Sequence, residues 1–129
     1  MVCERAHSFD IARSGYINLL QPQDKRSKKP GDSASAATAR GRLHSRGVTE
    51  PLAHAIAEMV GATSADSVLD VGCGDGYYLA YIAATSGANC SGVDISVPAI
   101  DAAARRNNSC RWVVANADRF VPGQTIRFL

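Results

Sequence analysis

The chain has 129 residues, 46% of them apolar, which suffices for one domain with a real core but is short for a complete doubly wound α/β sheet. The net charge of +2 hides an asymmetry: residues 1–50 carry nine Lys/Arg against five Asp/Glu, and residues 51–129 carry five against seven. The four cysteines fit no disulfide framework, and the N-terminus has no apolar run typical of a signal peptide. No stretch approaches the roughly 18 apolar residues that span a membrane. Together these features favour a cytoplasmic protein with reduced thiols.

The first 49 residues divide into two parts by composition. Residues 1–20 mix apolar and polar side chains and suggest a short strand or hairpin with Gly15 at the turn. Residues 21–49 are polar and rich in Lys, Arg, Ser, Gly and Pro, which is typical of a linker, with a short helix expected at Ala34–Arg42 behind an N-cap at Asp32 or Ser33. The excess of positive charge is compatible with a segment that faces a polyanion or with an ordinary solvated surface.

From Glu50 onward the pattern alternates between helices and strands. Pro51 suits the first turn of a helix at Glu50–Val60, whose Leu52, Ile56, Met59 and Val60 recur at helical spacing and which Gly61 ends. Two helices and three strands are then expected, with the first strand buried: Ser67–Val71, Tyr77–Ser86, Asn89–Asp94, Pro98–Asn107 and Arg111–Ala115. Such alternation implies an α/β fold with a parallel sheet and right-handed crossovers.

The strongest local signal is the glycine-rich turn that follows the first of these strands. Glycine permits positive φ and a close approach of a ligand to the main chain, so Gly72 and Gly74 are expected to leave room for a ligand and Gly76 to let the helix start close to the sheet. The spacing here is G-x-G-x-G, which differs from the G-x-G-x-x-G fingerprint that binds a pyrophosphate. The carboxylates of Asp70, before the turn, and Asp75, within it, would also repel phosphates. A cationic ligand without phosphate, such as S-adenosylmethionine, suits these carboxylates, and Asp70 is the candidate for its ammonium group. Cys73 and Tyr77 complete the predicted contacts of this turn.

Two later segments add further candidate contacts. Asp94 ends the second strand, where an acidic side chain can accept hydrogen bonds from both ribose hydroxyls, and Ile95 follows it. Ser96 stands nearer the next helix and is the better N-cap. Asn116 and Ala117 follow the third strand, where an Asn side chain and a backbone N–H can bind the adenine edge, although a loop cap fits Asn116 equally well.

These motifs resemble those of class I methyltransferases, and the first 33 residues narrow the resemblance. Cys3–His7, Gly15–Leu20, Lys25–Ser27 and Pro30–Ser33 are similar to the bacterial 23S rRNA (guanine-N1)-methyltransferases, and the similarity extends to about Pro122. The resemblance implies a remnant of a zinc-binding RNA-recognition module at residues 1–20, a basic linker at 21–49, and a partial Rossmann-like methyltransferase domain of three parallel strands at 50–129.

The resemblance also implies partners, cofactors and chemistry. Cys3 and His7 match half of a four-ligand zinc site, and two ligands cannot close a tetrahedral site, so little or no zinc is expected in this chain. The expected substrate is 23S rRNA, with no membrane partner and with a homodimer left open. Four side chains are the candidates for phosphate contacts: Lys25, Arg26, Lys28 and Lys29. No catalytic base is assigned. The alternatives are a methyltransferase of a small molecule or protein, and an inactive fragment that binds cofactor.

Overall fold

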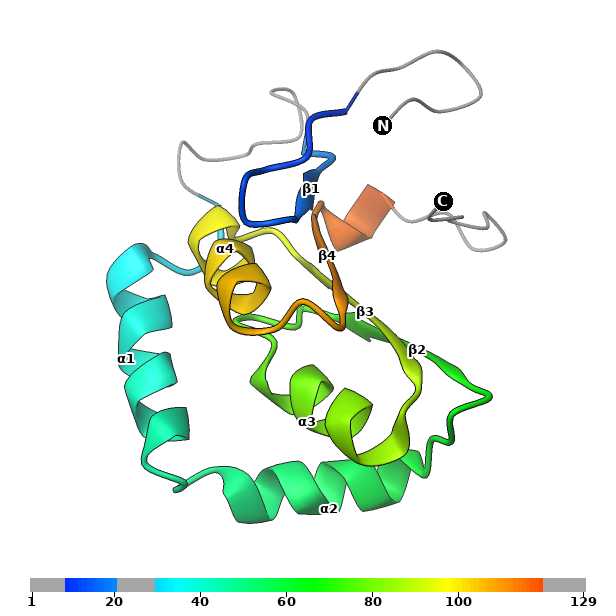
Figure 1. The fold of residues 1–129 in the computed structure, drawn as a ribbon. Helices are drawn as coiled ribbons and strands as arrows, with labels where there is room; N and C mark the ends of the chain where they lie inside the picture. Colours follow the sequence, from blue (N-terminus) through cyan, green and yellow to red (C-terminus); the bar gives the residue numbers. More distant parts are fainter. Residues whose placement is uncertain (1–8, 21–29, 120–129) are drawn as a thin grey trace.

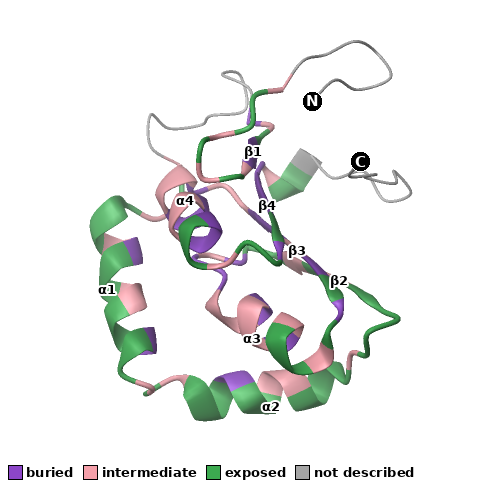
Figure 2. Cartoon of the chain, viewed as in Figure 1, coloured by how far each residue is buried: buried purple, intermediate pink, exposed green. Residues whose placement is uncertain are grey.

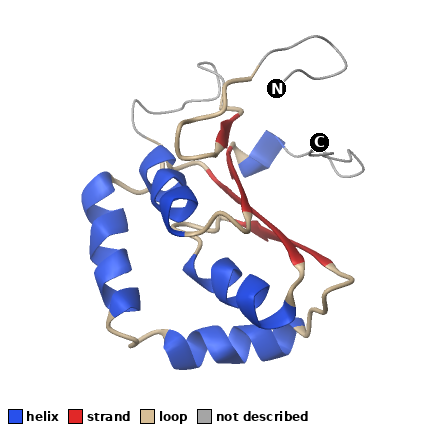
Figure 3. Cartoon of the chain, viewed as in Figure 1, coloured by secondary structure: helices blue, strands red, loops and turns tan. Residues whose placement is uncertain are grey.

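A computed structural model describes residues 9–20 and 30–119. Four parallel strands form one sheet in the order β1-β4-β3-β2, and the four α-helices lie to one side of the strands (Figures 1 and 3). The strands are β1 (Ile17–Asn18), β2 (Ser67–Val71), β3 (Asn89–Asp94) and β4 (Arg111–Val114). The helices are α1 (Ala34–Ser45), α2 (Glu50–Val60), α3 (Tyr77–Ser86) and α4 (Val97–Arg106), and a 3-10 turn covers Ala117–Arg119.

The predicted boundaries from residue 50 onward are confirmed to within one residue, because capping residues define them. Gly61 and Gly87 end α2 and α3 in the left-handed conformation. Ser96 caps α4 by accepting a hydrogen bond from Ala99 N at 3.3 Å, and Ser33 caps α1 in the same way from Ala36 N at 3.2 Å. Helix α1 continues three residues beyond the predicted Arg42.

The three strands expected after residue 50 are confirmed, and a fourth strand, from residues 9–20, extends their sheet. Residues 9–20 turn at Gly15, which has φ 101°, and Ile17 and Asn18 then pair in parallel with Val113 and Val114. The turn expected there is confirmed, but the parallel pairing is not evident locally because its partner lies almost 100 residues further along the chain. β1 therefore brings the N-terminal segment into the same sheet as the glycine-rich turn.

The main core lies between the sheet and helices α3 and α4. Its largest fully buried side chains include Leu79 of α3, Ile100 of α4 and Val114 of β4. Trp112 is also buried and donates a hydrogen bond from Nε1 to the carbonyl oxygen of Asn107 at 2.7 Å. Its ring packs where Gly76 and Gly92 have no side chains. Trp112 is therefore a core residue and not a surface aromatic side chain.

One prediction of burial was wrong, and one predicted apolar stripe is largely exposed. In β2, Leu69 and Val71 are each 53% exposed, because β2 is an edge strand among the described residues and no described helix covers their face (Figure 2). In α2, Leu52, Met59 and Val60 of the predicted stripe face solvent, whereas its Ile56 packs against the core together with Ala53 and Ala57. A helical period identifies an apolar stripe but does not show whether a partner covers it. Across the described residues, no helix has both the length and the apolar composition needed to cross a bilayer.

Candidate functional site

The turn between β2 and α3 is built around three glycines with positive φ. Gly72, Gly74 and Gly76 have φ values of 79°, 57° and 72°, a region in which an L side chain costs about 1–2 kcal/mol. Gly72 N and Cys73 N both donate to the carbonyl oxygen of Val93, at 2.8 and 3.1 Å. These bonds hold the turn against the carboxyl end of β3, so that residues from two strands meet at one edge of the sheet.

The three glycines have different surroundings. A Cβ on Gly72 would meet nothing within 4 Å, so the space beside this residue is open. A Cβ on Gly74 would lie 3.3 Å from Nη1 of Arg40. A Cβ on Gly76 would lie 2.2 Å from the Trp112 ring, which explains why α3 can start so close to the sheet. The turn thus has an open side at Gly72 and a packed side at Gly76.

Asp94 joins the turn to the start of α4. Its Oδ2 accepts a hydrogen bond from Gly74 N at 2.8 Å, and its Oδ1 accepts one from Ser96 N at 2.8 Å. A carboxylate has about four acceptor positions, so two remain for a ligand that reaches this edge of the sheet. Ser96, and not Asp94, is the N-cap of α4, in agreement with the sequence analysis.

Asp70 carries a charge that no described residue balances. It is half-buried at the end of β2, and no hydrogen bond or ion pair joins its side chain to another described residue. Burial and then the nearby carboxylate of Asp94 raise the pKa of Asp70. Two adjacent carboxylates, neither of them in an ion pair with a described residue, form a site that favours a positively charged ligand.

Asp75 differs from Asp70 because its charge is balanced inside the protein. It is 4% exposed, and its Oδ2 pairs with Arg106 Nη2 at 2.8 Å. Its Oδ1 lies 3.5 Å from Nε2 of His44. These contacts fasten α1 and α4 to the glycine-rich turn, and a direct contact of Asp75 with a ligand stays a prediction.

His44 was missed by the sequence analysis. The ring is 6% exposed, stacks on Tyr77 with centroids 3.9 Å apart, and makes a 2.7 Å hydrogen bond between Nδ1 and Thr49 Oγ1. Its Nε2 has no hydrogen-bond partner in the structure, and burial lowers the pKa of the imidazole. A single histidine on an alanine-rich helix gives no sequence signal, because Tyr77 and Asp75, which bring it to the turn, lie more than 30 residues further along the chain.

The other predicted contacts fall into two groups. Asn116 Oδ1 caps the 3-10 turn by accepting a hydrogen bond from Asp118 N at 3.0 Å. Ile95 is half-buried beside Gly31. Cys73 is buried, which raises the pKa of its thiol. The predicted zinc ligands Cys3 and His7 lie outside the described residues, as do all four predicted phosphate contacts (Lys25, Arg26, Lys28 and Lys29). Within residues 9–20 and 30–119, no three His, Cys, Asp or Glu side chains are grouped as a metal site requires.

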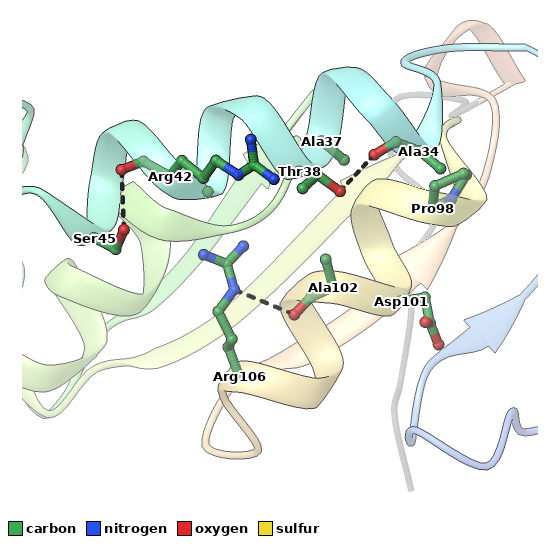
Figure 4. Close-up of a pocket in the computed structure, with 10 residues that line it drawn as sticks. Ala34, Ala37, Thr38, Arg42, Ser45, Pro98, Asp101, Ala102 and Arg106 are labelled. Carbon is green, nitrogen blue, oxygen red and sulfur yellow. Dashed lines mark hydrogen bonds between the residues drawn. The ribbon is translucent and has the colours of Figure 1, made fainter.

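An open groove of about 440 Å³ runs between α1 and α4, on the helical side of the molecule (Figure 4). Its walls are mostly small side chains, with Arg42 of α1 and Arg106 of α4 extending across it (Figure 4). The residues that line this groove do not include Gly72, Gly74 or Asp94. The groove is therefore distinct from the candidate site at the strand ends.

Comparison with known proteins identifies two regions of the chain. Residues 1–28 match the family model for the N-terminal zinc-ribbon region of RlmA, and residues 68–128 match the model for a methyltransferase domain. The chain is 35% identical over 119 residues to the 23S rRNA (guanine(748)-N(1))-methyltransferase of Streptomyces fradiae, covering 88% of this chain and 41% of that protein. It is 34% identical over 129 residues to YxjB of Bacillus subtilis, covering 92% of this chain and 44% of that protein. The chain thus spans about two fifths of the length of these relatives.

Solved structures share the fold. DesVI of Streptomyces venezuelae superposes with a TM-score of 0.53 at 23% identity, over 73% of this chain and 40% of that one. A TehB-like S-adenosylmethionine-dependent methyltransferase of Corynebacterium glutamicum superposes with a TM-score of 0.51 at 22% identity, over 69% of this chain and 50% of that one.

Proposed function

Since this chain belongs to the family of RlmA-like 23S rRNA (guanine-N1)-methyltransferases, we propose that its glycine-rich turn binds S-adenosylmethionine and that the protein methylates N1 of a guanine in 23S rRNA. The observation that supports the cofactor is the unbalanced carboxylate of Asp70 beside Asp94, next to open space at Gly72. S-adenosylmethionine has two positive groups, a sulfonium and an ammonium, and no phosphate.

We assign the contacts as follows. Gly72 and Gly74 let the cofactor lie against the main chain, and Asp70 accepts a hydrogen bond from its ammonium. Asp94 accepts from the ribose hydroxyls through the acceptor positions that its bonds to Gly74 N and Ser96 N leave free. Ile95 borders the same end of β3 and supplies an apolar contact for the adenine. Asn116 and Ala117 follow β4 and are assigned to the adenine edge.

The bound cofactor would supply an electrophilic methyl group. Methylation would also require the proton of N1 to leave, since guanine N1 is protonated at neutral pH. The residues assigned above bind and orient, and we assign the proton to none of them. An rRNA substrate is favoured over a small molecule because residues 1–28 match the RlmA N-terminal region as well as the methyltransferase domain.

Calorimetry with S-adenosylmethionine tests the cofactor assignment. Wild type should bind, and Asp94→Ala should bind roughly tenfold to a hundredfold more weakly because charge-assisted hydrogen bonds are lost. Asp101→Asn is the matched control, since this carboxylate on α4 bonds to Ser14 and Arg105. Equal affinity of wild type and Asp94→Ala would contradict the ribose assignment, and no binding by wild type would contradict the cofactor itself.

A further inference from the structure

The glycine-rich turn has a cation beside it, at Gly74, as well as carboxylates. Arg40 extends from α1 so that its Nη1 lies 3.3 Å from the position a Cβ on Gly74 would occupy. The same Nη1 pairs with Asp32 Oδ2 at 2.6 Å, and the two side chains remain 38% and 40% exposed. Arg106, the other arginine near the turn, is committed to buried Asp75.

The segment that carries this cation is fixed to the same edge of the sheet. Ser96 Oγ donates to the carbonyl oxygen of Asp32 at 2.7 Å. Gly31 packs so tightly against Ser96 that a Cβ there would lie 2.8 Å from the serine Cβ. The Asp32–Arg40 pair therefore links the loop after β3 to the turn after β2, across the region between the two strand ends.

The carboxylate of the proposed cofactor has no partner among the residues assigned to the cofactor so far. The cofactor's methionine portion carries this carboxylate beside the ammonium, and Asp70, Asp94 and Asp75 would each repel it. Burial of a carboxylate among carboxylates is costly unless a cation pairs with it. Arg40 is the guanidinium that the described residues bring to Gly74, and its five donors can hold a second carboxylate while keeping Asp32.

We infer that Arg40 binds the carboxylate of the cofactor's methionine portion, with Asp32 positioning the guanidinium over Gly74. This inference rests on the proposed function, because it concerns the same ligand. It adds a contact from α1, which precedes the methyltransferase-domain match. The exposed Asp32–Arg40 pair contributes little stability by itself, so its rearrangement around a ligand costs little.

Binding of two ligands that differ only in this carboxylate tests the inference. Arg40→Ala should weaken binding of S-adenosylmethionine roughly tenfold to a hundredfold, while binding of decarboxylated S-adenosylmethionine stays within about twofold of wild type. Arg40→Lys keeps the charge and should retain part of the affinity. Arg42→Ala is the matched control, since Arg42 lies on the same helix but faces the α1–α4 groove (Figure 4), and it should change neither affinity.

The outcomes separate this inference from the proposed function. Equal weakening of both ligands by Arg40→Ala would mean that Arg40 shapes the turn, and would overturn the carboxylate assignment alone. Unchanged binding of both would overturn it as well. Failure of wild type to bind either ligand would overturn the proposed function and this inference together. Thermal unfolding of each variant shows whether the fold is retained.

Discussion

Asp70 illustrates how a binding residue can oppose the stability of the free protein. Burial and the neighbouring Asp94 raise the pKa of its carboxyl above the ordinary value of 3.8. A raised folded-state pKa means that the folded chain binds this proton more tightly than the unfolded chain does. The ionised carboxylate therefore costs stability, fully above the raised pKa and not at all well below pH 3.8. A cationic ligand would offset that cost at neutral pH.

Asp70→Asn should accordingly raise the melting temperature of the ligand-free protein at pH 7 and weaken S-adenosylmethionine binding roughly tenfold or more. The stability difference should shrink as pH falls towards 3.8, since wild-type Asp70 then takes up its proton. Thermal melts across pH, together with calorimetry, measure both effects. Asp66→Asn serves as the control of opposite sign, because Asp66 accepts hydrogen bonds from Thr63 N and Oγ1 at 2.8 Å and has a lowered pKa. A lower melting temperature for Asp70→Asn would contradict this account.

At the scale of elements, the glycines of the turn separate ligand space from packing. Gly72→Ala should cost about 1–2 kcal/mol of unfolding free energy from its positive φ alone, and should weaken cofactor binding because the methyl group enters the open side. Gly76→Ala adds a collision with Trp112 and should cost about 3 kcal/mol or more. Chemical denaturation gives the free energies, and calorimetry gives the affinities.

A double-mutant cycle identifies the cause of the second effect. Trp112→Leu removes the ring atoms that a Cβ on Gly76 would meet, so Gly76→Ala should cost less in that background than in wild type. Additive costs would show that the ring does not limit this position. Equal loss of stability in Gly72→Ala and Gly76→Ala would likewise contradict the division between an open and a packed side.

The sequence predicts the elements better than their environments. Gly61, Gly87 and Ser96 end or cap helices through local geometry, so the boundaries from residue 50 onward follow from local patterns. The pairing of β1 with β4, and the pairing of Asp75 with Arg106, depend on residues distant in the chain. The exposed faces of α2 and β2 were not predicted for the same reason, since an apolar stripe in the sequence does not show which element covers it.

At the scale of the whole molecule, the described residues on either side of the basic segment 21–29 lie at the edge of the sheet that holds the candidate site. On one side, Leu19 N donates to the carbonyl oxygen of Val114 at 2.8 Å and Leu20 is buried in the core. On the other side, Gly31 packs on Ser96. Parallel strands end at this edge, so the residues that bracket Lys25, Arg26, Lys28 and Lys29 lie beside the loops after β3 and β4. Phosphate contacts there would bring RNA to the methyl donor.

Replacing these four cations with alanine should therefore weaken binding of a 23S rRNA fragment and flatten its dependence on salt. Each phosphate contact adds about 0.7–0.9 to the slope of log affinity against log salt, so four lost contacts should reduce the slope by about 3. Fluorescence anisotropy titrations at several salt concentrations measure the slope. Arg42→Ala with Arg46→Ala removes one cation of α1 and one at its C-cap, outside the basic segment, and should change the slope less. S-adenosylmethionine affinity should be the same in the quadruple variant and wild type, because none of the four is assigned to the cofactor. An unchanged salt slope would remove the basic run from the RNA-binding surface, even if the cofactor assignments hold.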